Sequence, residues 1–231
     1  MVKYFKLKGS KTSKYKSLVF REKPKKFSKK CKETYIKKTE SLIITGMHSS
    51  GKTRELQKII KNKDLIYKKT KFIILKGTDS LSDWFTHNID DDDIYTYLNQ
   101  YTEDEKIVIE KEMKKQYMKI EVLKNKAKNS VLIIDDIDRL SGKKTEVVKD
   151  LVRDSRIVIA TAKELLEIDR TINSLLHYKK YREISLGTSQ SYDATNILFV
   201  MILMGMVATG AYELAVLIMA GRYALKGKER R

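Results

Sequence analysis

An eight-residue stretch near the start of the chain has the composition and spacing of a phosphate-binding loop. It fits the pattern G-x-x-x-x-G-K-[ST], the Walker A motif, without a gap or substitution. Its glycines allow backbone N–H groups to wrap around phosphates, and a helix that begins there directs its positive end at them. Lys52 is expected to reach the terminal phosphates, and the Thr53 hydroxyl to ligate Mg²⁺. The predicted binding residues are Gly46, Met47, His48, Ser49, Ser50, Gly51, Lys52 and Thr53.

Two carboxylates follow a strongly apolar run further along the chain. Residues 131–134 (VLII) are followed directly by Asp135 and Asp136, which places both acids at the carboxyl end of a predicted buried strand. One acid at this position holds Mg²⁺ through water, and the next polarises the attacking water. We assign Asp135 to the metal and Asp136 to the water. Together with Lys52, the pair predicts water attack on the terminal phosphate of a nucleotide.

The elements that must position these residues alternate between short apolar runs and helical stretches. Short continuous apolar runs separated by helices indicate a parallel sheet that is buried on both faces. The predicted fold class is therefore α/β, a three-layer domain with a five-stranded, mainly parallel sheet. A charged stretch at 102–129 has apolar residues near helical spacing and predicts one long amphipathic helix. The predicted strands are 41–45, 71–75, 131–134, 157–160 and 183–186, and a helix is expected over 52–61.

Over residues 41–190 the order of elements resembles the AAA+/STAND branch of the P-loop NTPases. In that branch an inserted strand separates the acid-bearing strand from the first strand. The run IIDDIDRL (133–140) is similar to the acid motif of STAND and KAP-type ATPases, RIVIAT (156–161) to their sensor strand, and YREISL (181–186) to their closing strand.

This resemblance implies that the protein binds ATP and Mg²⁺ and that it forms a homo-oligomer. It also implies that Thr161 contacts the γ-phosphate or the attacking water. Many relatives use an arginine from a neighbouring subunit, for which Arg153, Arg170 and Arg182 are the candidates. Two departures stand out: Asp136 replaces the usual Glu, and the helical lid after the fifth strand is missing or replaced.

The charge of the chain is concentrated at its N-terminus. The whole sequence has 48 Lys+Arg against 30 Asp+Glu, a net charge of +18. Residues 1–40 hold fourteen lysines and Arg21 against three glutamates, a net charge of +12, with aromatic residues interleaved. They predict a basic arm. Two interpretations stay open for it: a solvated tail, or a contact with the phosphates of nucleic acid or anionic lipid.

A long apolar segment lies near the other end of the chain. Between residues 197 and 220 the only charged side chain is that of Glu213. As a helix this segment would measure about 36 Å at 1.5 Å per residue, against a hydrocarbon core of about 30 Å. A membrane segment is predicted, followed by a basic tail over 221–231. A re-entrant hairpin turning near Thr209 and a buried lid are the alternatives.

Composition excludes several classes of protein. Apolar residues make up 42% of the chain, which is enough for a core and excludes wholesale disorder. The single cysteine, Cys31, excludes a disulfide framework and a cysteine-built zinc site. An acidic run, Asp90–Asp93, is interpreted as the cap of a helix beginning near Ile94 rather than as a divalent-ion site.

These features together predict a membrane-anchored ATPase whose nucleotide domain faces the cytoplasm. Hydrolysis of Mg-ATP would drive a conformational change in the protein itself or in a partner. Two other functions stay open. One is a nucleic-acid motor or an assembly ATPase of a mobile element or virus, in which the basic arm grips DNA. The other is a switch that binds ATP tightly and hydrolyses it slowly.

Overall fold

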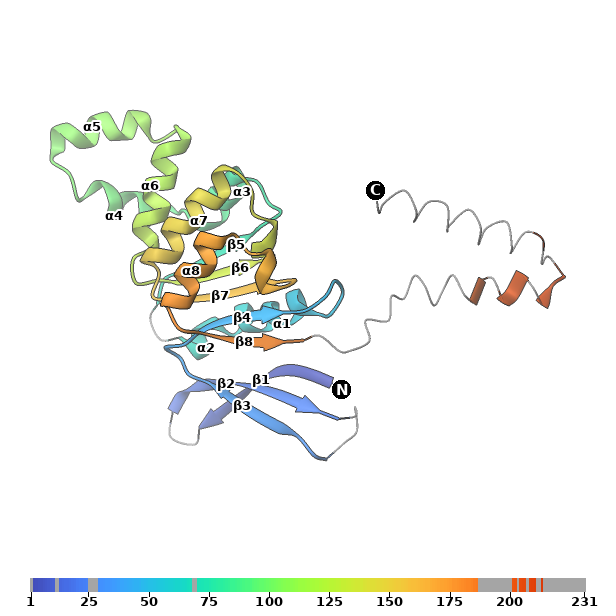
Figure 1. The fold of residues 1–231 in the computed structure, drawn as a ribbon. Helices are drawn as coiled ribbons and strands as arrows, with labels where there is room; N and C mark the ends of the chain where they lie inside the picture. The colour runs from blue at the N-terminus through green and yellow to red at the C-terminus, as the bar shows by residue number, and fades with distance from the viewer. Residues whose placement is uncertain are drawn as a thin grey trace. The chain divides into compact units, whose positions relative to one another are not determined.

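The computed structural model describes residues 2–10, 13–24, 29–67, 70–186 and, beyond these, 201, 202, 204–206, 208–210 and 213. The chain divides into two compact units, Met1–Thr188 and Ser189–Arg231 (Figure 1). The first unit contains the phosphate-binding motif and both aspartates.

A five-stranded sheet forms the centre of this first unit, with the order β5-β6-β7-β4-β8 and every adjacent pair parallel. Strand β7 lies between β4, which leads into the phosphate-binding motif, and β6, which carries the acids. This is the inserted strand that the sequence predicts, so the α/β fold of the P-loop type is confirmed. The strand bounds are β4 Ser41–Thr45, β5 Phe72–Lys76, β6 Val131–Asp135, β7 Ile157–Ala162 and β8 Tyr181–Ser185.

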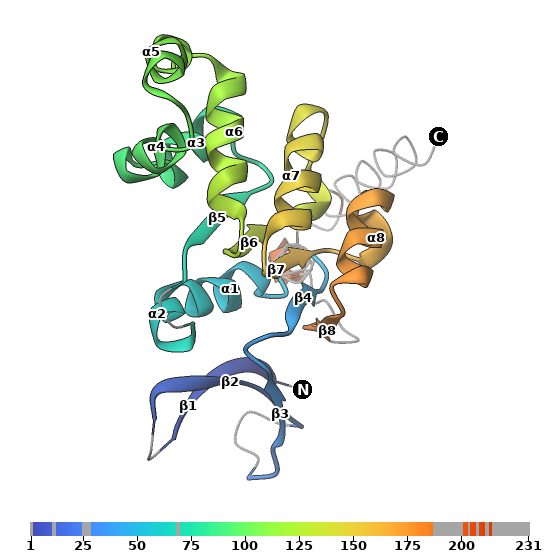
Figure 2. The ribbon, with the colours of Figure 1, turned by 90° about the vertical axis from the view of Figure 1, so that its left-hand side faces the viewer.

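Helices cover the sheet on both faces, so that its central strands are fully buried. All residues of β4, β6 and β7 are buried. One face packs side chains of α3, α6, α7 and α8, and the other packs side chains of α1 and α2. Figure 2 shows these two helix layers from the side. The bounds are α1 Lys52–Lys61, α2 Lys63–Ile66, α3 Leu81–Asn88, α7 Lys143–Asp154 and α8 Arg170–Tyr178.

The prediction of one long helix over 102–129 is wrong. The stretch forms α5 (Glu103–Glu112) and α6 (Gln116–Ala127), and α4 (Asp91–Leu98) precedes them. The break allows Met113 and Ile109 to pack on a small apolar cluster formed by Tyr97, Met118 and Val122. A single straight helix would carry these side chains away from the cluster, so tertiary packing decides the break.

The described residues of the predicted basic arm, 1–40, do not form a solvated tail. Its residues form a three-stranded antiparallel sheet of β1 (Val2–Ser10), β2 (Ser13–Lys23) and β3 (Lys32–Ile36). Apolar residues stand two positions apart, Phe5 and Leu7 in β1 and Leu18 and Phe20 in β2, and therefore share one face of the sheet. That face supplies Phe5, Leu18, Phe20 and Ile36 to the core around α1. The rings of Phe5 and Phe20 lie 5.2 Å apart, measured between centroids.

Two hydrogen bonds connect this N-terminal sheet to the nucleotide domain. The backbone N–H of Phe5 donates to Oε2 of Glu55 at 2.9 Å. Glu55 lies on α1 and is 1% exposed. The Lys3 ammonium donates to the carbonyl oxygen of Ser185 in β8 at 2.8 Å. Strands β1, β2 and β3 are therefore an integral layer of the first unit.

Most of the predicted membrane segment, 197–220, and all of the tail, 221–231, lie outside the described residues. Within the part of the chain that the structure describes, no helix has both the length and the apolar character needed to span a membrane. The hairpin and buried-lid alternatives fall on the same residues.

Candidate nucleotide-binding site

The loop between β4 and α1 leads directly into the N-terminus of α1. Gly51 caps the N-terminus of α1 with a φ of +88°, a left-handed conformation that favours glycine. The first turn of α1 leaves N–H groups free of intrahelical partners, and they point out of the helix end. The loop borders a cavity of about 490 Å³, lined by His48, Ser49, Ser50, Gly51, Lys52, Thr53, Asp136, Asp138, Arg139 and Lys163.

The ammonium of Lys52 is held by the loop itself. It donates to the carbonyl oxygen of Gly46 at 2.6 Å and to that of Met47 at 3.2 Å. Lys52 is 8% exposed, so few other acceptors reach it. Gly46 and Met47 therefore contribute carbonyl groups that keep the cation at the mouth of the loop.

Asp135 is the central acceptor of the site. Its Oδ1 accepts hydrogen bonds from the Thr53 hydroxyl at 3.3 Å and from the Thr161 hydroxyl at 2.5 Å. The side chains predicted as Mg²⁺ ligands, Thr53 and Asp135, therefore lie together although they come from α1 and β6. Asp135 is 6% exposed, at the end of β6, which lies between β5 and β7.

Asp136 sits in a conformation that few residues adopt. Its φ is +53° and ψ is +55°, the left-handed region that aspartate tolerates better than most residues. Its N–H donates to Oγ1 of Thr161 at 2.8 Å. This bond and the left-handed backbone turn the Asp136 side chain out of the sheet and into the lining of the cavity.

The electrostatic environment disfavours ionisation of Asp136. Burial, together with the neighbouring Asp135 carboxylate, raises the pKa of the Asp136 carboxyl, and Arg139 opposes this shift. Arg139 Nε lies 4.0 Å from Oδ2 of Asp136. A carboxylate with a raised pKa is a stronger base than an ordinary aspartate, which suits a group that polarises water.

Thr161 has a supporting place in the site. It is fully buried, and its hydroxyl group donates to Asp135 and accepts from the N–H of Asp136. It does not belong to the described residues that line the cavity. Thr161 therefore fixes the two acids relative to each other, and its predicted contact with a phosphate stays a prediction.

Sequence reasoning missed four residues of the site. Asp138, Arg139 and Lys163 line the cavity, and the Lys163 carbonyl accepts from the N–H of Gly46 at 3.1 Å. All three follow β6 or β7 directly, so the rule that parallel strands present their carboxyl ends at one edge could have found them. Gly77 follows β5, and a Cβ there would lie 2.1 Å from the Asp136 carbonyl oxygen.

Mg²⁺ and a phosphate chain fit the residues present. The Oγ of Ser50 and the Oδ1 of Asp138 are buried and have no hydrogen-bond partner among the described residues. Both residues line the cavity beside the cations Lys52, Arg139 and Lys163. Mg²⁺ in nucleotide sites takes one or two protein oxygens plus phosphates and waters, and Thr53 with Asp135 supplies such a pair.

The other polar features of the sequence lie outside this cavity. Asp90 and Asp93 form a capping box at the start of α4, so the predicted cap is present although the helix begins at Asp91 and not near Ile94, and Asp93 is paired with Lys126 at 2.5 Å. The described residues contain no cluster of three acidic, histidine or cysteine side chains that could hold a metal. Of the arginine candidates, Arg182 is paired with Glu40 at 3.0 Å and Arg153 with Asp150 at 3.2 Å.

Comparison with known proteins gives similarity of fold at low sequence identity. No protein-family model and no curated protein matches the chain. Among solved structures, EccC of Thermomonospora curvata (ATPases 2 and 3, with a signal sequence peptide) is similar over 80% of this chain, with 12% identity and a TM-score of 0.40. The ORC1 protein of Aeropyrum pernix in complex with DNA is similar over 83%, with 12% identity and a TM-score of 0.40.

A third similar structure is domain III of the Thermotoga maritima replication initiation protein DnaA, with 16% identity over 62% of this chain and a TM-score of 0.35. The chain spans 36% of the EccC chain, 55% of the ORC1 chain and 54% of the DnaA chain. At these values the similarities assign no function, which has to come from the geometry of the site.

Proposed function

We propose that this protein binds Mg-ATP in the cavity at the carboxyl edge of the parallel sheet and hydrolyses it. The observation that carries the proposal is the convergence of the Thr53 and Thr161 hydroxyl groups on Asp135, with Asp136 bonded to Thr161, beside a loop with a complete Walker A sequence. AAA+/STAND membership and ATP as the nucleotide rest on the sequence resemblance.

Each group would have one role in the reaction. The N–H groups of the loop and the Lys52 ammonium bind the phosphate chain, and Thr53 and Asp135 hold Mg²⁺. The metal, when bound, neutralises charge that develops on the phosphate oxygens. Asp136 accepts a hydrogen bond from the attacking water and orients it, and Arg139 holds Asp136 at 4.0 Å.

The experiment that tests this proposal measures phosphate release and nucleotide binding in parallel. Asp136→Asn is expected to keep Mg-ATP bound and to lower turnover about 10²-fold or more, because it removes the base and leaves Asp135 in place. Asp154→Asn changes an exposed acid at the opposite edge of the sheet and serves as the control. Equal turnover of Asp136→Asn and the unchanged protein would refute the role of Asp136.

A slow switch is the second candidate function. It is favoured by the second acid, because the Asp136 side chain is one methylene shorter than that of the usual Glu. Single-turnover measurement separates the two candidates. A switch retains ATP over many minutes with negligible release of phosphate, whereas an enzyme that drives a cycle releases phosphate continuously and faster when its partner is added.

Membrane anchoring and a cytoplasm-facing nucleotide domain form a separate proposal that rests on the apolar residues 197–220. Deleting residues 197–231 is expected to move the protein from the membrane pellet to the supernatant. Full-length protein that stays monodisperse without detergent would refute the membrane proposal. It would leave the ATPase proposal untouched.

A further inference from the structure

The edge of the parallel sheet opposite the nucleotide site collects exposed basic side chains. Because all the strands run in one direction, the segments that precede them meet at this single amino edge, which Figure 2 faces. Each of the five strands is preceded or begun by at least one cation. The exposed cations of this amino edge are Lys37, Lys38, Lys71, Lys128, Arg156 and Lys180.

Hydrogen bonds join these segments into one continuous surface. They link the segment before β5 to that before β6, the segment before β6 to that before β7, and the segment before β7 to that before β8. Strand β4 is joined to β7 by the N–H of Val158, which donates to Oγ of Ser41 at 3.1 Å. The N–H of Val131 donates to the Lys71 carbonyl at 2.9 Å, the N–H of Arg156 to the Ser130 carbonyl at 2.9 Å, and the ammonium of Lys179 to the Ser155 carbonyl. The basic groups are therefore fixed on a rigid support.

Acidic side chains do little to neutralise this edge. Glu40 is engaged by Arg182, whose NH2 lies 3.0 Å from Oε1 of Glu40. The buried carboxylate of Asp93 is shared by Lys126 at 2.5 Å and Lys71 at 3.6 Å. Asp154 is the exposed acid near Arg156. The cations consequently outnumber the acids along the edge.

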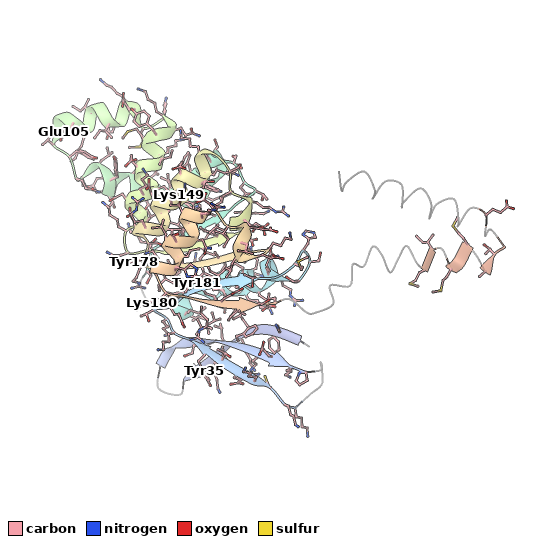
Figure 3. All side chains as sticks on the ribbon, viewed as in Figure 1. Tyr35, Glu105, Lys149, Tyr178, Lys180 and Tyr181 are labelled. Atoms are coloured by element: carbon pink, nitrogen blue, oxygen red, sulfur yellow. The ribbon has the colours of Figure 1, made fainter. Side chains whose placement is uncertain are left out.

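One exposed aromatic ring adjoins the cations. Tyr178, at the end of α8, is 88% exposed and lies two residues before Lys180. Figure 3 shows Tyr178 and Lys180 on the same side of the sheet, where β8 begins. The Arg156 guanidinium is held in place by a hydrogen bond from NH2 to Oγ1 of Thr70 at 3.2 Å.

The arrangement is a row, because neighbouring strands of a sheet are spaced by about 4.8 Å, so the edge of this sheet is about 19 Å long. A flexible single strand presents its phosphates in a row, and its bases stack on exposed aromatic rings. A lipid surface presents a plane of charge, which a narrow edge contacts poorly. We propose that this amino edge binds single-stranded nucleic acid, with Lys128, Arg156 and Lys180 contacting phosphates and Tyr178 stacking on a base.

The first test removes three charges from the edge of the full-length protein. Binding of a fluorescein-labelled single-stranded oligonucleotide is measured without nucleotide, so the result does not depend on ATP hydrolysis. The triple variant Lys128→Gln/Arg156→Gln/Lys180→Gln is expected to lower the slope of log K against log salt by about 2, since each single-strand phosphate contact contributes about 0.7. Its affinity for ATP should be unchanged.

A matched control removes the same charge elsewhere. Lys111, Lys114 and Lys143 are exposed and lie on α5, between α5 and α6, and at the start of α7. Changing all three to Gln should leave the salt slope as in the unchanged protein. An equal loss in both triple variants would overturn the proposal, because binding would then follow net charge alone.

The second test addresses stacking. Tyr178→Ala is expected to weaken oligonucleotide binding about fivefold to a hundredfold, while Tyr178→Phe keeps the ring and the affinity. Thermal unfolding of both variants confirms that the exposed position leaves the fold intact. Equal affinities of the two variants would refute the stacking contact. Stronger binding to phosphatidylserine vesicles than to the oligonucleotide at matched salt would overturn nucleic acid as the partner.

Discussion

At the carboxyl edge of the parallel sheet, backbone amides, two aspartates and Lys52 surround a cavity, whereas the amino edge is lined by exposed lysines, Arg156 and a tyrosine ring. The same five strands position both sets of residues. In a parallel sheet, residues after the strands gather at one edge and residues before them at the other. In this chain, the residues that follow the strands form the candidate nucleotide site, and the residues that precede the strands form an exposed basic surface.

The largest effect is expected from Lys52→Ala, because Lys52 is the point charge of the phosphate-binding loop. ATP turnover should fall to background, and nucleotide affinity should fall with it. The control, Lys180→Ala, removes the same charge from the amino edge and should keep full turnover. Phosphate release and nucleotide titration measure both. Normal turnover by the Lys52 variant would contradict this difference between the two edges, and so would a loss of turnover in the Lys180 variant.

A smaller effect is expected from Gly77→Ala. The added Cβ would lie 2.1 Å from the Asp136 carbonyl oxygen, so the backbone must move and Asp136 with it. The free energy of unfolding should fall by about 1–3 kcal/mol, and turnover should fall more than ATP affinity. Gly9→Ala is the matched control, since nothing lies within 4 Å of its added Cβ. Urea unfolding that is identical for both variants would contradict this close approach.

Glu55→Ala tests whether the N-terminal sheet is part of the nucleotide domain. The change leaves the Phe5 N–H without its acceptor and should lower the free energy of unfolding by about 1–3 kcal/mol. Glu55→Gln keeps an acceptor oxygen and should recover part of this loss. The exposed Glu146, 71% accessible at its side chain, provides the control substitution Glu146→Ala. Denaturant unfolding followed by circular dichroism makes the comparison.

The smallest effect concerns pH. Burial and Asp135 raise the pKa of Asp136, so the acid limb of turnover should lie above the ordinary aspartate pKa of about 3.9. The ionised form is the active one, and activity is therefore lost as the pH falls through the raised pKa. For stability the sign is opposite: ionised Asp136 costs folding free energy above its ordinary pKa, and protonation removes that cost.

Arg139→Gln sharpens the pH prediction. Arg139 lowers the pKa of Asp136, so its removal should move the acid limb to higher pH. Lys163→Gln provides a control, since Lys163 lines the cavity but is paired with Glu167. A profile that does not move in the Arg139 variant would show that the two side chains do not interact in solution.

Much of the fold was predictable from local sequence. The strands of the parallel sheet are short, continuous apolar runs, a pattern that depends only on burial of both faces. The phosphate-binding loop was predictable because its glycines and lysine act at fixed spacing. Asp135 and Asp136 were predictable because they follow an apolar strand directly. In each case the information lies within about ten neighbouring residues.

The N-terminal sheet and the break between α5 and α6 were not predictable in this way. The apolar residues Phe5, Leu18 and Phe20 belong to a stretch in which lysine is the commonest residue, so composition indicates a solvated arm. These side chains are buried because they pack against the apolar surface around α1, and that surface is formed by residues distant in sequence. The break near Met113 likewise depends on an apolar cluster contributed by α4 and α6.

The sequence by itself determined the identity of the loop, the two acids and the succession along the chain of the five strands of the parallel sheet. Tertiary structure decided which remote groups meet them: Thr161 bridging Asp135 and Asp136, and Gly77 making room for the backbone of Asp136. It also decided that basic segments distant in sequence form one amino edge. The physical reason is that spacing along the chain fixes local conformation, whereas contacts between strands depend on how the whole sheet is ordered.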